Sequence, residues 1–270
     1  MKKVTELDAK AEELLKQFQN DYNRILEENF AQTLSENENV RLFFINEDQA
    51  FTDGKNIVVD PAVGDLFADR KALDDITDFL HWPKVMLVDS WNALRIITRA
   101  QTIHECLHVL YTDFPPRLCK DPKCNTKNKK TVMSLISNII EDTYIEAVGC
   151  SYYDNMEFYL KFGRVSQCFY NRKVEGTASR ALASSLPQQP QLGDEPKPPT
   201  KAELLLDYLD YMVTLLLYPF VKMSEPAEEI KTYIDKTKQL FLDGCVAASP
   251  AERYEYCSKI FDEILDLIPD

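Results

Sequence analysis

The residues best suited to chemistry lie in the segment His104-Glu105-Cys106-Leu107-His108. The chain has three histidines, and two of them stand here four positions apart. On an α-helix such residues lie one turn apart on the same face, so both imidazoles can converge on one Zn²⁺. Glu105, next to the first histidine, is placed to accept a proton from an attacking water. The H-E-x-x-H pattern therefore predicts a zinc site of the peptidase type. The alternative is a solvated helix face that carries these residues by chance.

The surrounding sequence predicts the helix that this spacing requires. Asp89 and Ser90 offer an N-cap, and residues 91–111 contain no proline or glycine. Apolar residues recur there at steps of three and four, which predicts a stripe facing the core: Ile96, Ala100, Ile103, Leu107 and Leu110. We expect the two histidines to lie beside this stripe, on a packed helix that leaves them accessible on one side.

A catalytic zinc site needs a third protein ligand and one open position for water. The helix expected over residues 131–149 presents Glu141 away from its apolar stripe, so Glu141 is the predicted ligand. Asp142 is the predicted partner of a histidine, and Asp142 and Asp113 are the alternative ligands. The competing interpretation is that Glu141, Asp142 and Glu146 form a solvated acidic face.

Other polar residues near these two segments are candidates for supporting roles. The hydroxyl of Tyr111 or Tyr144 would be suited to share the negative charge that develops on a carbonyl oxygen under attack. Asn138 and Asp113 are candidates for hydrogen bonds that orient the ligands.

The segments from His104 to Asp113 and from Asn138 to Glu146 together resemble the gluzincin branch of zinc metallopeptidases. More narrowly, they are similar to a metallopeptidase-like domain found upstream of von Willebrand factor A domains in bacterial and phage proteins. Those proteins are often encoded beside MoxR-type AAA ATPases. The resemblance covers residues 40–150 and implies a zincin fold. It also implies three zinc ligands, His104, His108 and Glu141, and Glu105 as the general base.

Two features depart from this family pattern. The interval between His108 and Glu141 is long for a gluzincin, and no von Willebrand segment follows residue 270. We therefore expect either a stand-alone version of the domain or the front part of a longer protein.

The composition limits the classes of function. A formal net charge of -13 argues against general binding to nucleic acid or to an anionic membrane, because both need a basic surface. The first residues indicate no signal peptide, and the most apolar run, residues 212–221, is too short to span a bilayer. Seven cysteines without a paired pattern favour reduced thiols and a cytoplasmic location.

The chain as a whole is predicted to be a mostly helical α+β protein. We expect a zincin-like core over residues 1–174, a Pro/Gln/Ser-rich linker or flap over 175–200, and a helical region over 201–270. In the core, an apolar stripe predicts one amphipathic helix over residues 6–30. A turn signal between strands at 40–45 and 57–59 predicts a small antiparallel sheet.

Three functions fit these patterns. The first is a zinc-dependent peptidase acting on a peptide or protein, with Glu105 as general base. The second is a non-catalytic module that zinc stabilises and that works with a von Willebrand factor A protein or a MoxR-type ATPase. The third is a metal-free helical protein in which the motif has arisen by chance. Glu105 favours the first, because a purely structural zinc site has no use for a general base.

Overall fold

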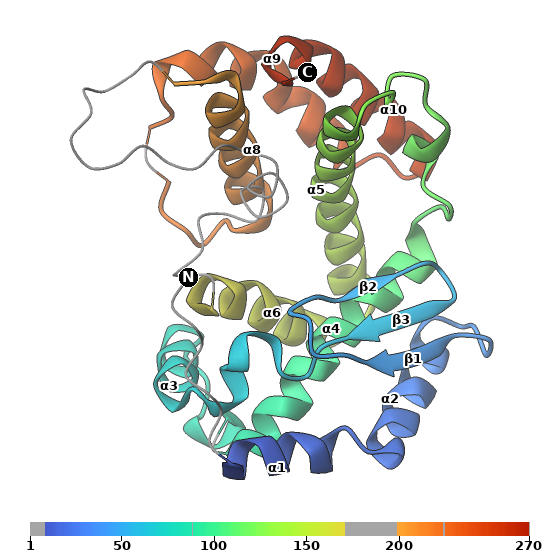
Figure 1. Cartoon of the computed structure of the whole chain (residues 1–270), viewed down its shortest axis with the longest axis vertical. Coiled ribbons are helices and arrows are strands. Elements are labelled where there is room, and N and C mark those ends of the chain that lie inside the picture. The colour runs from blue at the N-terminus through green and yellow to red at the C-terminus, as the bar shows by residue number, and fades with distance from the viewer. Residues whose placement is uncertain (1–8, 88, 171–198, 224, 270) are drawn as a thin grey trace. The chain divides into compact units, whose positions relative to one another are not determined.

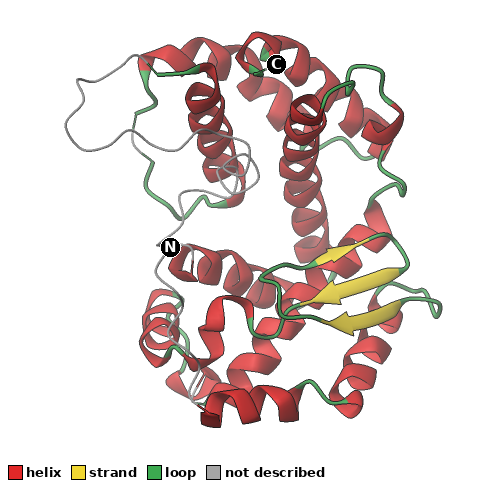
Figure 2. Ribbon diagram, viewed as in Figure 1, coloured by secondary structure: helices red, strands yellow, loops and turns green. Residues whose placement is uncertain are grey.

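A computed structural model describes residues 9–87, 89–170, 199–223 and 225–269. This part of the chain is mostly helical and contains a three-stranded mixed sheet, as Figure 2 shows. The coarse prediction of a mostly helical α+β fold is therefore confirmed. Within the described residues, no helix combines the length and apolar character that crossing a membrane requires.

The chain forms two compact units that are interleaved in sequence. Unit 1 comprises residues 1–114 and 145–172, and unit 2 comprises residues 115–144 and 173–270. This differs from the sequential division expected at residue 174, because residues 115–144 pack with the C-terminal helices. The predicted linker at 175–200 lies almost entirely outside the described residues.

Unit 1 begins with two helices where the apolar pattern predicted a single one. Helix α1 (Ala9–Phe18) ends before Asn20, and α2 (Asp21–Leu34) begins directly after it. Asn20 has an extended backbone, and its side chain accepts a hydrogen bond from the Asn23 amide. An asparagine that satisfies the first turn of a new helix in this way interrupts the previous one. The prediction of one continuous helix was therefore wrong.

The sheet consists of β1 (Arg41–Phe44), β2 (Phe51–Thr52) and β3 (Asn56–Val59), in the order β1-β3-β2. Strand β3 pairs antiparallel with β2 and parallel with β1. The predicted turn therefore joins β2 to β3, and the prediction of a purely antiparallel sheet was wrong. Local turn signals identify a hairpin, but they do not determine where the preceding strand is placed in the sheet.

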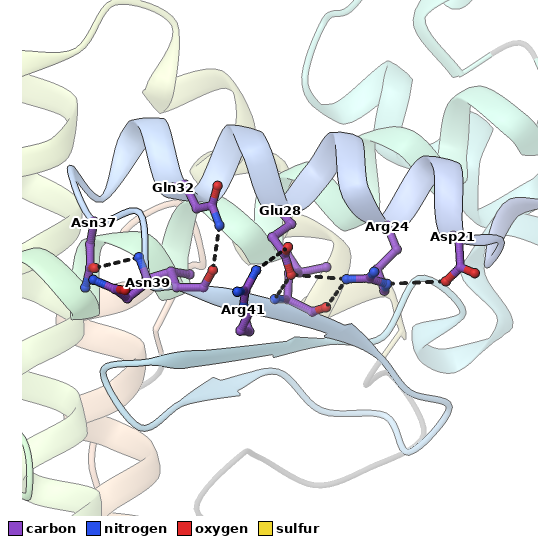
Figure 3. Close-up of polar contacts among 9 residues, drawn as sticks. Asp21, Arg24, Glu28, Gln32, Asn37, Asn39 and Arg41 are labelled. Atoms are coloured by element: carbon purple, nitrogen blue, oxygen red, sulfur yellow. Dashed lines mark hydrogen bonds and ion pairs between the residues drawn. The ribbon is translucent and has the colours of Figure 1, made fainter.

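Side chains of α2 occupy the outer edge of β1 (Figure 3). Glu28 Oε2 accepts the Leu42 N–H at 3.0 Å, and Arg24 donates to the Leu42 carbonyl at 3.3 Å. One turn further along α2, Gln32 donates to the Val40 carbonyl at 2.9 Å. These contacts take the place of a neighbouring strand, and therefore the edge of β1 that faces away from β3 is closed by a helix.

Helix α4 (Ser90–Tyr111), which the N-cap and the lack of helix breakers predicted, is the centre of unit 1. Asp89 caps it by accepting the Asn92 amide at 2.8 Å, and Arg95 is the single exposed residue along its length. Further elements of unit 1 contact α4 or its neighbours, and α3 and α6 are labelled in Figure 1: η1 (Val63–Ala68), α3 (Arg70–Phe79), η2 (Lys84–Leu87) and α6 (Met156–Tyr170).

Unit 2 is built from helices that bury a common apolar core. The first part of α5 (Lys127–Tyr152) contributes Val132, Ile136 and Ile140, and a buried hydrogen bond of 2.7 Å joins Tyr208 to Thr237. The remaining elements of unit 2 are η3 (Arg117–Lys120), α8 (Lys201–Leu217), α9 (Glu228–Gly244), α10 (Pro250–Glu263) and η5 (Leu265–Leu267). The helix α5 is continuous, and its C-terminal part from Ile145 onward belongs to unit 1.

Candidate metal centre

The part of α4 that carries the two histidines is held in place from one side by the sheet. Cys106 is fully buried with Leu42, Ile57 and other inward residues of the strands. The Gln101 amide both donates to and accepts from the backbone of Asp60, at 2.8 and 2.7 Å, directly after β3. These contacts fix the rotation of α4, and hence the side on which its histidines lie.

His104 and His108 lie together on α4, as the four-residue spacing predicts. Their ring centroids are 4.9 Å apart and the ring planes stand at 85°. The His104 side chain is 21% exposed, so it is packed yet accessible. This arrangement brings two imidazoles to one place on a rigid helix.

Each imidazole has a partner at Nδ1. His104 Nδ1 lies 3.0 Å from Glu146 Oε1, and His108 Nδ1 lies 3.0 Å from the hydroxyl of Thr112. A neutral imidazole that donates from Nδ1 carries its lone pair on Nε2. Metal-binding histidines commonly use this arrangement, in which the partner at one nitrogen orients the other toward the ion.

Asp142 completes a group that could hold a metal ion. One ligand atom each from His104, His108 and Asp142 lies within 4.8 Å of the others. Tetrahedral zinc ligands stand about 3.3 Å apart, given metal–ligand bonds of about 2.0 Å. Two imidazoles and a carboxylate are also a donor set that Zn²⁺ accepts, with a fourth position left for water. The residues present therefore fit the metal.

Glu141, the predicted third ligand, has a different partner. Its carboxylate pairs with the guanidinium of Arg253 through two contacts, at 2.8 and 3.1 Å. Arg253 is fully buried, donates also to the carbonyls of Ala247 and Ala248, and lies over the ring of Tyr144. The structure thus places Asp142, the alternative ligand, in the group with the histidines and places Glu141 in the core of unit 2.

The other predicted site residues are placed as follows. Glu105 is on α4 between the histidines and is 4% exposed. Tyr111 is the last residue of α4 and is half-buried, whereas Asp113 and Asn138 are exposed and Asp113 is not in the group. Tyr144 packs against Arg253, which gives its ring a structural contact.

Two further residues, Glu146 and Arg164, connect to His104 and were not among the candidates identified from the sequence. Arg164 Nη2 and Nε contact the two Glu146 oxygens at 2.6 and 3.2 Å. Burial raises the pKa of Glu146, but the charge of Arg164 and the hydrogen bond from His104 outweigh it and hold that pKa below its ordinary value. Glu146 is therefore an anion that accepts the His104 N–H. Its position four residues after Asp142, on the same helix face, was the available signal.

No protein-family model, curated protein or solved structure matches this chain.

Proposed function

We propose that this chain is a zinc-dependent peptidase with His104, His108 and Asp142 as metal ligands and Glu105 as general base. The observation that carries the proposal is the group of two imidazoles and one carboxylate on packed helices, with Glu105 next to His104 in the sequence. The zincin resemblance agrees with the motif, and the third ligand is taken from the geometry rather than from the family pattern.

Zinc bound at this group would supply Lewis acidity, which lowers the pKa of water toward about 7 and polarises a peptide carbonyl. Glu105 precedes His108 by one helical turn and follows His104 directly, so its carboxylate belongs to the same stretch of α4. In the proposed reaction it accepts the proton of the attacking water and passes that proton to the leaving amine.

The sheet supports a peptide as the substrate. Strand β2 lies at the edge opposite β1 and contacts α4, while side chains of α2 close the outer edge of β1. An extended peptide that adds a strand to this sheet would therefore add beside β2. Main-chain pairing of this kind holds a polypeptide with little regard to its side chains.

The substitution Glu105→Gln tests the assigned base. Gln keeps the size of the side chain but cannot take up a proton, so peptide hydrolysis should fall by about 100-fold or more while one zinc per chain is retained. Glu157→Gln, which removes an exposed carboxylate from α6, is the matched control and should keep the parent's rate. Full cleavage by Glu105→Gln would contradict the assignment.

A second candidate is a non-catalytic module that zinc stabilises and that binds a von Willebrand factor A protein or a MoxR-type ATPase. The low exposure of Glu105, 4%, favours it, because a base that acts on substrate must be reached by water. Stoichiometric zinc without cleavage of any member of a peptide library would support the module. Elemental analysis of the parent and of His104→Ala separates both candidates from a metal-free protein.

A further inference from the structure

Among the described residues of unit 1, two arginines each bind a glutamate through two contacts. Only one of these two glutamates also contacts a histidine. Arg164 joins Glu146 through Nε and Nη2, and Arg99 joins Glu27 through the same two atoms at 2.8 and 2.9 Å. Glu146 contacts His104 as well, at 3.0 Å. The two pairs therefore differ in whether the carboxylate also contacts a histidine.

We propose that Arg164 is a positioning residue for the metal centre, acting through Glu146 to fix the ring of His104. This inference rests on the proposed zinc site. A carboxylate held at both oxygens by a planar guanidinium cannot rotate freely. The oxygen that His104 Nδ1 meets, Oε1, is the same atom that lies 2.6 Å from Arg164 Nη2.

The surroundings keep this chain of contacts rigid. The side chains of Arg164 and Glu146 are 12% and 17% exposed. Helix α6, which carries Arg164, packs on α4, and Trp82 stacks on its Phe158 with ring centroids 3.8 Å apart. Arg164 is thus anchored on a helix that has packing contacts outside the site as well, and it can hold Glu146 in one orientation.

The two histidines differ in how they are held. His108 meets a neutral hydroxyl from Thr112, which lies on its own helical turn, whereas His104 meets an anion from another helix. A partner from a separate helix must be oriented by something other than local helix geometry. Arg164 provides that orientation, and so its loss should disturb His104 and leave the contact at His108 intact.

The test compares Arg164→Gln with Arg99→Gln, which breaks the equivalent pair at Glu27. Zinc affinity, measured by competition with a chromophoric chelator, should fall by about 10- to 100-fold for Arg164→Gln, the range typical of partners that orient a metal ligand. The absorption spectrum of the Co²⁺ form of Arg164→Gln should also differ from that of the parent. Arg99→Gln should lower the unfolding midpoint but keep the parent's affinity and spectrum.

Arg164→Lys covers the case in which Arg164→Gln does not fold. Lysine keeps the positive charge but loses the two-point contact, so the variant should fold and still bind zinc more weakly than the parent. Parent-like affinity and Co²⁺ spectrum in folded Arg164→Gln or Arg164→Lys would overturn the inference, even if the parent binds zinc and cleaves peptides. If the parent does not bind zinc, both the proposed function and the inference about Arg164 are overturned.

Discussion

Adjacent acidic residues on α5 have different environments. Glu141 pairs with the fully buried Arg253, whereas Asp142 lies with the two histidines. Successive residues on a helix point about 100° apart, so neighbouring carboxylates face different partners. Two neighbouring positions in the sequence therefore carry a carboxylate paired with an arginine and a carboxylate that lies with the histidines.

Exchanging each carboxylate for its amide distinguishes these roles. Glu141→Gln leaves the charge of Arg253 without a counterion, and should lower the free energy of unfolding by about 3–5 kcal/mol while keeping zinc affinity. Asp142→Asn should keep the stability of the metal-free protein. Its zinc affinity should fall by more than the 10- to 100-fold loss that is typical when a residue that orients a metal ligand is replaced. Urea unfolding and chelator competition measure the two effects. The reverse pattern would identify Glu141 as the ligand.

The placement of the two histidines side by side could be predicted from the sequence, but which carboxylate lies with them could not. His104, Glu105 and His108 share one helix, so their relation follows from local spacing. Whether Glu141 or Asp142 faces the histidines depends on Arg253, which is distant in sequence and was not recognised as a partner. The contact between Glu146 and Arg164 is long-range in the same way.

At the level of elements, the contact of α5 with α4 depends on a glycine. A Cβ placed on Gly149 would lie 2.8 Å from Leu107 Cδ1 and 3.0 Å from Met156 Sδ. Leu107 is fully buried directly before His108, and Gly149 follows Glu146 by three residues. The absence of a side chain at Gly149 thus permits the close approach that brings Glu146 to His104.

Gly149→Ala should therefore loosen the site as well as the fold. The added methyl group overpacks the contact, which should cost about 1–3 kcal/mol of unfolding free energy despite the better helix propensity of alanine. Zinc affinity should fall with it, because Glu146 would be displaced from His104. Gly163→Ala is the control, since its Cβ would meet Ala100 at an ordinary 3.8 Å. Equal stability of the two variants would contradict this reading of the contact.

Elements defined by local signals were predicted better than those defined by long-range pairing. Helix α4 follows from the Asp89 cap and an unbroken run of helix-compatible residues. The break between α1 and α2 had a signal in Asn20, which the continuous apolar stripe concealed. The parallel placement of β1 had none, because strand order depends on contacts that no local pattern encodes.

Across the whole molecule, buried thiols are present in both units. Cys106 is buried in unit 1, and Cys245 and Cys257 are buried in unit 2. Burial raises the pKa of Cys257 to about 12 and that of Cys245 to about 11. An unfolded cysteine ionises near pH 8.5. Between those values the unfolded chain loses protons that the folded chain retains, so stability should decline as the pH rises.

Cys257→Ala tests this alkaline dependence. Between pH 7 and 9.5 the parent should lose on the order of 1 kcal/mol of unfolding free energy through this thiol alone, and the variant should lose correspondingly less. Urea unfolding at the two pH values measures the difference. Equal losses in parent and variant would mean that the folded thiol titrates as readily as the unfolded one.

The closed edge of β1 also limits how copies of this chain can associate. Fibrous polymers that grow by edge-to-edge strand pairing need every subunit to offer two edges, one to receive a neighbour and one to extend the array. Here the outer edge of β1 is already occupied by side chains of α2, namely Glu28, Arg24 and Gln32. Pairing through the sheet in its folded form would consequently stop at two copies.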